Sequence, residues 1–348
     1  MSDQDVRDFL ERMAAEEPVS FVEAEPLTRR ARRRAARTVV VGALGVAAAI
    51  AVLFAGVAEI RTTPIPAIHP TPTPSADLGI FAPVAGRIVY GDRQGIWGVD
   101  PAAPADPATR VQLTSEPGTP LEWSSDGTRL LIMRDLRGEQ RGLHLVVMHA
   151  DGSETKVTER RGWIPGATIS PDGSRVVFAD YRGLYSVDVE GGPAEVLLER
   201  GEDDVYAPTF SPDGTQIAYI VGSGDHGHRV WVMNAEGSDA RQILANETTM
   251  GADHVRRLAW SPAGDRIALG MDEDTYTFAT DGSDFTRVIT SGTVPYWSPD
   301  GSRLAYAVVC LQHSEGCSLA IADADGSNVN DFGFGRPGPW HPAPRGAS

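Results

Sequence analysis

Short segments in which apolar and polar residues alternate recur along most of this chain, separated by turns rich in proline, aspartate and glycine. In QIAYI (216–220), Ile217 and Tyr219 alternate with their neighbours, as residues of a β-strand do. The segments VWVMNA (230–235) and RQIL (241–244) follow, each after a further turn. The pattern predicts an all-β region of short strands joined by tight turns over residues 79–348.

Two turn phrases punctuate these strands at regular intervals. The first is Trp-Ser-Pro-Asp-Gly at 297–301, which recurs with changes at 123–127, 169–173, 210–214 and 260–264. Its proline fixes φ, and Asp-Gly supplies residues that tolerate positive φ. The second is Asp-Gly-Ser at 151–153, 281–283 and 325–327, with Glu-Gly-Ser-Asp at 236–239. The turn residues of the first phrase are Asp126, Gly127, Asp172, Gly173, Asp213, Gly214, Gly264, Asp300 and Gly301.

An aromatic residue stands before most copies of the first phrase, at the end of a predicted strand. We expect these rings to pack between neighbouring sheets. They are Trp123, Phe210, Trp260, Trp297 and Trp340.

The spacing of the repeats predicts a β-propeller with six blades. Successive glycines of the first phrase are 46, 41, 50 and 37 residues apart, and a period near forty with four strands per unit is typical of propellers. The final copy, Trp340-His341-Pro342, has no strand after it, whereas the strand at 86–90 has no such phrase before it. Together they form one composite blade that closes the ring and leaves short, protected edges.

The pair of phrases, W-S-P-D-G-x-x-[IL]-A-[YF] followed by V-M-N-A-x-G-S, resembles the propeller repeat of TolB and its relatives, over roughly residues 85–345. The resemblance implies a scaffold for binding. The same propeller also occurs beside the hydrolase domain of prolyl-oligopeptidase-like enzymes. This sequence has no α/β domain of the TolB kind before the propeller and no G-x-S-x-G motif. We therefore transfer neither envelope transport nor peptidase activity, and we expect no catalytic residue, no metal and no cofactor.

The first quarter of the chain has a different pattern. Residues 39–58 are twenty uncharged, mostly apolar residues, about the length that crosses a bilayer, and we assign residues 38–60 to a transmembrane helix. A cluster of arginines precedes this run, and only Arg61 follows it closely; the cluster is Arg29, Arg30, Arg32, Arg33, Arg34 and Arg37. The positive-inside rule places residues 1–37 in the cytoplasm and the propeller outside. The alternative is a cleaved signal peptide ending at Gly56-Val57-Ala58.

The remaining N-terminal segments are a linker and a tail. Residues 61–78 are rich in proline and threonine, a composition that favours an extended spacer. In the tail, the apolar residues Val6, Phe9, Leu10 and Met13 have helical spacing after a capping box at Ser2 and Asp5. This amphipathic helix either docks a cytoplasmic partner through residues 1–17 or lies on the membrane surface.

Charge excludes one class of partner. The net charge of the chain is −16. Residues 1–37 contain eight acidic and eight basic residues, so the excess of acid belongs to the rest of the chain. Nucleic acid needs clustered positive charge, and the predicted propeller does not offer it.

Several residues have the chemistry of a site without its spacing. Cys310 and Cys317 bracket a predicted hairpin, and we expect them to form a disulfide rather than a metal site. Asp225, His226, His228, Asp253 and His254 offer zinc ligands only if two loops converge. Asp323 and Asp325 resemble part of a calcium loop that lacks its final glutamate, and Glu202, Asp203 and Asp204 form an acidic loop.

Three functions fit the sequence. The first is a single-pass, membrane-anchored propeller outside the cell that binds a protein, glycan or cell-wall partner. The second is a transmembrane regulator, anti-sigma-like or sensory, whose propeller senses and whose tail docks a cytoplasmic partner. The third is a propeller hydrolase or lyase with its site in the central channel. The repeat, the apolar run and the missing catalytic motif favour the first.

Overall fold

The computed structural model describes residues 78–102, 109–136, 142–158, 164–180, 182–199, 201–223, 227–244, 255–308, 318–332 and 336–342. The chain divides into two compact units, Met1–Ile68 and His69–Ser348, and all described residues belong to the second. Residues 1–77, with the predicted tail, transmembrane helix and nearly all of the linker, lie outside the described part. Within the described ranges, no helix combines the length and apolar character that crossing a membrane requires.

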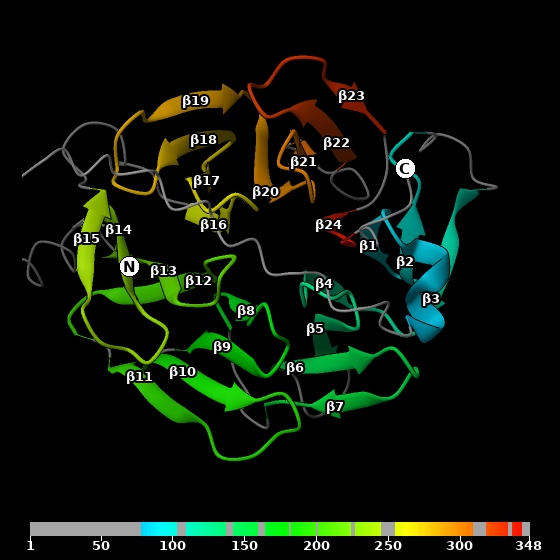
Figure 1. Ribbon diagram of the computed structural model, residues 1–348, viewed down its shortest axis with the longest axis horizontal. Helices are drawn as coiled ribbons and strands as arrows, with labels where there is room; N and C mark the ends of the chain where they lie inside the picture. The colour runs from blue at the N-terminus through cyan, green and yellow to red at the C-terminus, as the bar shows by residue number, and fades with distance from the viewer. Residues whose placement is uncertain are drawn as a thin grey trace, which may run out of the picture. The chain divides into compact units, whose positions relative to one another are not determined.

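The described strands form six four-stranded antiparallel sheets arranged around a common centre (Figure 1). From the centre outwards, the first three blades contain β24 (Arg336–Trp340), β1 (Ile88–Asp92), β2 (Gly95–Val99) and β3 (Val111–Thr114); β4 (Thr119–Trp123), β5 (Arg129–Leu136), β6 (Gly142–His149) and β7 (Glu154–Lys156); and β8 (Ala167–Ile169), β9 (Arg175–Asp180), β10 (Gly183–Asp188) and β11 (Glu195–Glu199).

The remaining three blades repeat this order. They contain β12 (Asp204–Phe210), β13 (Gln216–Ser223), β14 (Gly227–Asn234) and β15 (Arg241–Leu244); β16 (Val255–Trp260), β17 (Arg266–Met271), β18 (Asp274–Ala279) and β19 (Thr286–Ile289); and β20 (Gly292–Trp297), β21 (Arg303–Val308), β22 (Ser318–Asp323) and β23 (Asn330–Asp331). The prediction of a six-bladed all-β propeller is confirmed.

Antiparallel order divides the connections between two faces of the ring. The turns from first to second strand and from third to fourth strand lie on one face, which we call the turn face. The opposite face, the loop face, carries the connections from second to third strand and from each outer strand to the next blade. A short 3-10 helix, η2 (Gly79–Val84), joins the turn face, where the backbone N–H of Ile80 donates to the carbonyl of Ala150 (2.8 Å).

The apolar core is divided into six clusters, one at each contact between neighbouring blades. The structure places the five aromatic residues of the first turn phrase at these contacts: Trp123, Phe210, Trp260, Trp297 and Trp340. Trp123, for example, meets the ring of Phe81 edge-on, with centroids 4.8 Å apart. Stability therefore comes mainly from contacts between blades.

Side chains that alternate along a strand of this propeller point to two different neighbouring blades, and not to a core on one side and to solvent on the other. Ile217, Ala218, Tyr219 and Ile220 on β13 are all buried, because another blade covers each side. Ile217 and Tyr219 join the cluster shared with the third blade, whereas Ala218 and Ile220 join the one shared with the fifth. Alternate residues thus stabilise opposite interfaces.

The ring is closed by the composite first blade. Strand β24 pairs antiparallel with β1, with Ile88 opposite Trp340 and Gly91 opposite Arg336. The backbone N–H of His341 then donates to the carbonyl of Arg87 (2.8 Å). The predicted pairing of the two ends of the propeller is confirmed.

His341 extends this closure to the second blade. Its buried ring lies 4.5 Å from the Trp123 ring, and its Nε2 is 3.1 Å from the carbonyl oxygen of Gly127. A Cβ on Gly127 would lie 2.5 Å from Cε1 of this imidazole, and φ there is +72°. Glycine is therefore required at this position for both its conformation and its size.

Each complete copy of the first turn phrase is held by one carboxylate. In the last copy, the Ser298 hydroxyl donates to Asp300 Oδ1 (2.6 Å), and both the backbone N–H and the hydroxyl of Ser302 donate to the same oxygen (3.0 and 2.8 Å). Ser298 Oγ in turn accepts from the backbone N–H of Arg303 (2.9 Å). These bonds hold the pKa of Asp300 below its usual value.

The altered copy Trp260-Ser-Pro-Ala-Gly keeps this interaction by other means. Alanine occupies position 263, where the other copies have aspartate, but Asp265 two positions later accepts from the Ser261 hydroxyl (2.7 Å). The backbone N–H of Arg266 still donates to Ser261 Oγ (3.1 Å). The turn therefore depends on a carboxylate near the serine more than on its place in the sequence.

Replacing Trp340 by alanine is expected to lower the free energy of unfolding by about 3–5 kcal/mol, because it removes a large buried ring from the contact that closes the ring of blades. Urea unfolding followed by tryptophan fluorescence measures the change. The control is Val196→Ala at an exposed position on β11, which should change stability by less than about 0.5 kcal/mol. Equal effects of the two substitutions would contradict the proposed role of the interface.

Acid is expected to weaken the propeller through its turn carboxylates. Because the pKa of Asp300 is lower in the folded chain than in the unfolded one, its contribution is complete above the unfolded value of about 3.9 and disappears as pH falls through the folded value. The urea midpoint should therefore fall below pH 4. Asp300→Asn should make this fall shallower, and an unchanged slope would argue against the assignment.

Candidate functional site

The inner strands carry a repeated irregularity at the central channel. In five of the six blades, the innermost strand has one residue more than its partner over the paired segment, which is a β-bulge. In two of them the bulge contains a residue with positive φ directly before a proline: Ala207 (51°) and Val294 (58°). Positive φ is strained for a β-branched residue such as valine. Bulges turn neighbouring side chains away from the regular alternation, here at the channel.

Arg257 on β16 reaches across the ring. Its Nη2 donates to the carbonyl of Leu121 on β4 (3.2 Å), in the blade opposite its own. Its guanidinium carbon also lies 4.1 Å from the centroid of the Tyr296 ring on β20, close enough for a cation–π interaction. One side chain thus links three blades through the centre of the propeller.

A carboxylate completes this cluster. Glu122, beside Leu121 on β4, accepts a hydrogen bond from the Thr168 hydroxyl on β8 (2.5 Å), and Thr168 Oγ1 accepts from the backbone N–H of Phe210 on β12 (3.3 Å). Burial raises the pKa of Glu122, although the charge of Arg257 and the bond from Thr168 oppose the rise. Burial likewise raises the pKa of the Tyr296 hydroxyl. We call Glu122, Thr168, Arg257 and Tyr296 the channel cluster.

The channel cluster could not be predicted from motifs, because none of its members belongs to a recognised one. Their positions nevertheless follow the repeat. Glu122, Thr168 and Tyr296 stand one residue before the residue that opens the turn phrase, and Arg257 stands three residues before Trp260. A comparison of these offsets between copies places all four residues on innermost strands.

The acidic loop at 202–204 lies on the loop face and is paired. Arg229 Nη2 on β14 forms an ion pair with Asp203, and Asp204 begins β12. Next to them, the Tyr206 hydroxyl is hydrogen-bonded to Nδ1 of the buried His228. Burial raises the pKa of Tyr206 well above its usual value. These contacts join residues of β12 and β14 in a structural network at the loop face.

The other predicted residues divide into placed and undescribed ones. The Asp325 carboxylate accepts from the backbone N–H and the hydroxyl of Ser327 (2.9 and 2.6 Å), and Asp323 accepts from the Asn328 amide (2.6 Å). Cys310, Cys317, Asp225, His226, Asp253 and His254 lie outside the described residues, as do the arginine cluster and the tail helix. Within the described ranges, no group of three or more His, Cys, Asp or Glu side chains is arranged to hold a metal.

Arg257→Met is expected to lower the free energy of unfolding by about 1–3 kcal/mol, because the Leu121 carbonyl loses its donor and Glu122 loses its countercharge. In the Arg257→Met background, Glu122→Gln should restore part of the loss, whereas Glu122→Gln alone should destabilise. Urea unfolding of the four proteins gives the coupling. If the two substitutions are additive, the charges do not act together.

Comparisons with known proteins agree with the β-propeller fold described above. Residues 162–276 match a family described as "Lipoprotein LpqB beta-propeller domain". The protein TolB homolog of Chlorobium luteolum is 28% identical over 145 residues, which are 38% of this chain and 31% of the relative. The chain thus spans about a third of the length of this relative.

Two solved structures share the fold. A putative TolB from Agrobacterium tumefaciens superposes with a TM-score of 0.52 and 22% identity over 73% of this chain and 93% of that one. A chain of a nidogen/laminin complex superposes with a TM-score of 0.56 and 10% identity over 73% of this chain and 96% of that one. Together with the six blades closed by β24, these matches show that the described part of the chain is a six-bladed β-propeller similar to that of TolB.

Proposed function

We propose that this chain is a membrane-anchored binding protein whose propeller lies outside the cell and recognises a protein partner through its loop face. The observation that carries the proposal is the contrast between the two faces. The turn face is built of repeated tight turns whose aspartates and serines satisfy one another. The loop face carries connections of unequal length and no repeated phrase, which is where binding residues of a repeat scaffold are usually found.

The channel cluster favours a binding site on the loop face over one inside the central channel. Side chains from opposite blades meet at the axis, so a ligand that entered the channel would have to displace Arg257 from the Leu121 carbonyl and the Tyr296 ring. The loop face needs no such rearrangement. A protein surface fits the breadth of this face better than a small molecule does.

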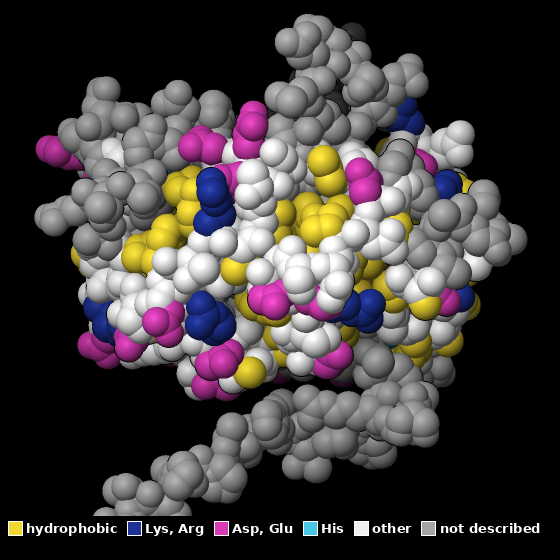
Figure 2. All heavy atoms as spheres, turned by 90° about the horizontal axis from the view of Figure 1, so that it is seen from above, with side chains coloured by type: hydrophobic (Ala, Val, Ile, Leu, Met, Phe, Trp, Pro, Cys, Tyr) yellow, Lys and Arg dark blue, Asp and Glu magenta, His cyan; other side chains and the backbone are white. Residues whose placement is uncertain are grey.

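Charge on the outer surface is compatible with a protein partner. The side of the ring in Figure 2 shows acidic and basic side chains interspersed with apolar ones, without a broad basic patch. This side of the propeller is thus suited to contacts of mixed character and unsuited to the nucleic-acid backbone.

Anchoring rests on the apolar run at 39–58 and the arginines before it. The described chain enters the propeller at the turn face through η2, and β24 ends at the same face. Leu78 therefore joins the propeller at the face opposite the loop face.

A cysteine introduced on each face tests both parts of the proposal in intact cells of the native host. Glu273 is exposed in the loop-face turn between β17 and β18, and Glu190 is exposed in the turn-face turn between β10 and β11. Full-length Glu273→Cys and Glu190→Cys proteins are labelled with a membrane-impermeant maleimide that carries a photocrosslinker. We expect both to be labelled and only position 273 to give a defined protein adduct after irradiation.

The unsubstituted protein provides the background from Cys310 and Cys317. Labelling only after the cells are permeabilised would refute the extracytoplasmic location. Labelling at both positions with adducts only from position 190 would refute the assignment of the loop face while leaving the anchor intact. No protein adduct from either position would refute the protein partner.

A further inference from the structure

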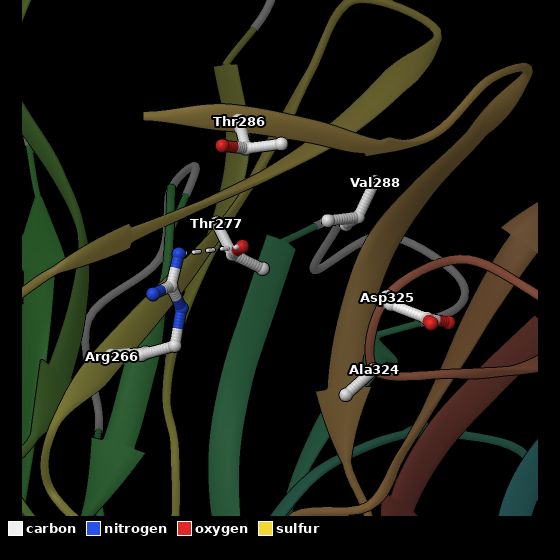
Figure 3. A pocket seen from close by; sticks show the side chains of 6 residues that line it. All are labelled: Arg266, Thr277, Thr286, Val288, Ala324 and Asp325. Carbon is white, nitrogen blue, oxygen red and sulfur yellow. Dashed lines mark hydrogen bonds between the residues drawn. The ribbon is translucent and has the colours of Figure 1, made fainter. Parts of the chain in front are cut away.

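A cleft on the turn face lies between the fifth and sixth blades, remote from the loop face and the channel cluster. Its volume is about 310 Å³, and it is lined by Arg266, Thr277, Thr286 and Val288 of the fifth blade and by Ala324 and Asp325 of the sixth (Figure 3). Arg266 begins β17, and Ala324 and Asp325 belong to the turn between β22 and β23. The cleft thus separates the second strand of one blade from a turn of the next.

Arg266 has only neutral acceptors in this cleft. Its Nη2 donates to Thr277 Oγ1 (3.2 Å) and to the carbonyl of Asp284 (3.3 Å), and both bonds are long. Among the described residues, no carboxylate lies within ion-pair distance of this guanidinium. A half-buried cation without a countercharge is unusual in a protein whose propeller carries a large excess of acid.

At the equivalent position between the third and fourth blades, an arginine has the acidic partner that Arg266 lacks among the described residues. Arg175 begins β9 as Arg266 begins β17, and Glu236 occupies the place in its turn that Asp325 occupies in the sixth blade. Arg175 Nη2 and Glu236 Oε1 are 3.7 Å apart and bridge the two blades. The same groove is thus bridged by a charge pair in one place, whereas no described carboxylate pairs with Arg266 in the other.

Two features prevent Asp325 from closing the cleft. Its side chain is one methylene shorter than that of Glu236, and its Oδ1 is held by the backbone N–H and hydroxyl of Ser327. The turn already lies close to β19, because a Cβ on Gly326 would be only 1.7 Å from the Val288 carbonyl oxygen. In Figure 3 the Asp325 carboxylate points away from Arg266.

The chemistry of the lining defines the ligand. Arginine binds carboxylates through paired N–H donors, and Arg266 retains N–H groups beyond those that bond Thr277 and Asp284. The Thr277 hydroxyl accepts from Arg266 and can donate to a ligand oxygen, and the Thr286 hydroxyl donates to the Asp284 carbonyl and can accept. Val288 and Ala324 form the apolar part of the lining of the cleft.

We propose that this cleft binds an acidic sugar residue, with its carboxylate on Arg266 and its hydroxyls on Thr277 and Thr286. The volume is at the lower end of the range for small-molecule sites and accommodates one sugar ring. The apolar wall suits the C–H face of such a ring. The site is independent of the protein partner proposed for the loop face.

Titration of the full-length chain in lipid nanodiscs with D-glucuronate tests the site, using isothermal calorimetry. We expect a Kd of about 1 mM, as is usual for a ligand of this size. Arg266→Gln should weaken binding at least about tenfold, and Thr286→Val should weaken it by a smaller factor. Asp325→Glu should also weaken binding, because the longer side chain can pair with Arg266 as Glu236 pairs with Arg175.

The matched control is Arg175→Gln, which removes the equivalent arginine from the closed groove and should leave the affinity unchanged. Thermal unfolding of each variant verifies that it is folded, and Thr286→Val, at an exposed position, keeps the test valid if Arg266→Gln fails to fold.

D-glucose and L-glutamate are titrated in parallel. Equal binding of D-glucose would overturn the role of the carboxylate, and equal binding of L-glutamate would overturn the assignment to a sugar. Equal losses from Arg175→Gln and Arg266→Gln would overturn the site itself.

Discussion

The antiparallel pairing of β24 with β1 is the interaction on which the rest of the propeller depends. Each blade is covered on both sides by its neighbours, and its apolar residues belong to two different clusters. An open ring would leave one side of two blades exposed to water. Closure therefore adds the sixth interface, with Trp340 and Ile88 in its core, and supplies the last neighbour that the first and sixth blades need.

The sequence predicted the parts of this architecture that are set locally. Proline and Asp-Gly fix turn geometry within five residues, and the aromatic residue before most of these turns needs only its strand to reach an interface. A motif search alone would misjudge the turn at 260–264, where alanine replaces the aspartate of the motif at position 263. Asp265 supplies the carboxylate of this turn from two positions later. The number of blades followed from counting copies, and the composite blade from the complementary gaps at the two ends.

The channel cluster and the turn-face cleft could not be predicted in the same way. Arg257 and Leu121 are 136 positions apart, and their contact depends on the diameter of the ring and on the bulges in the inner strands. The cleft depends on one methylene of difference between Asp325 and Glu236, together with the place of Gly326 against Val288. Such differences between copies cannot be recognised in the sequence, because the effect of each residue depends on the residue that folding places beside it.

The composite blade also determines when the molecule can fold during its synthesis. Strands β1 to β3 are made before the other strands of the propeller, yet their innermost neighbour consists of residues 336–340, which are made after the other five blades. A nascent chain that has made five blades still has an unpaired edge on β1, and this edge can pair with another strand until β24 has been made. The order of synthesis therefore makes the addition of β24 the step that ends the exposure of this edge to misassembly.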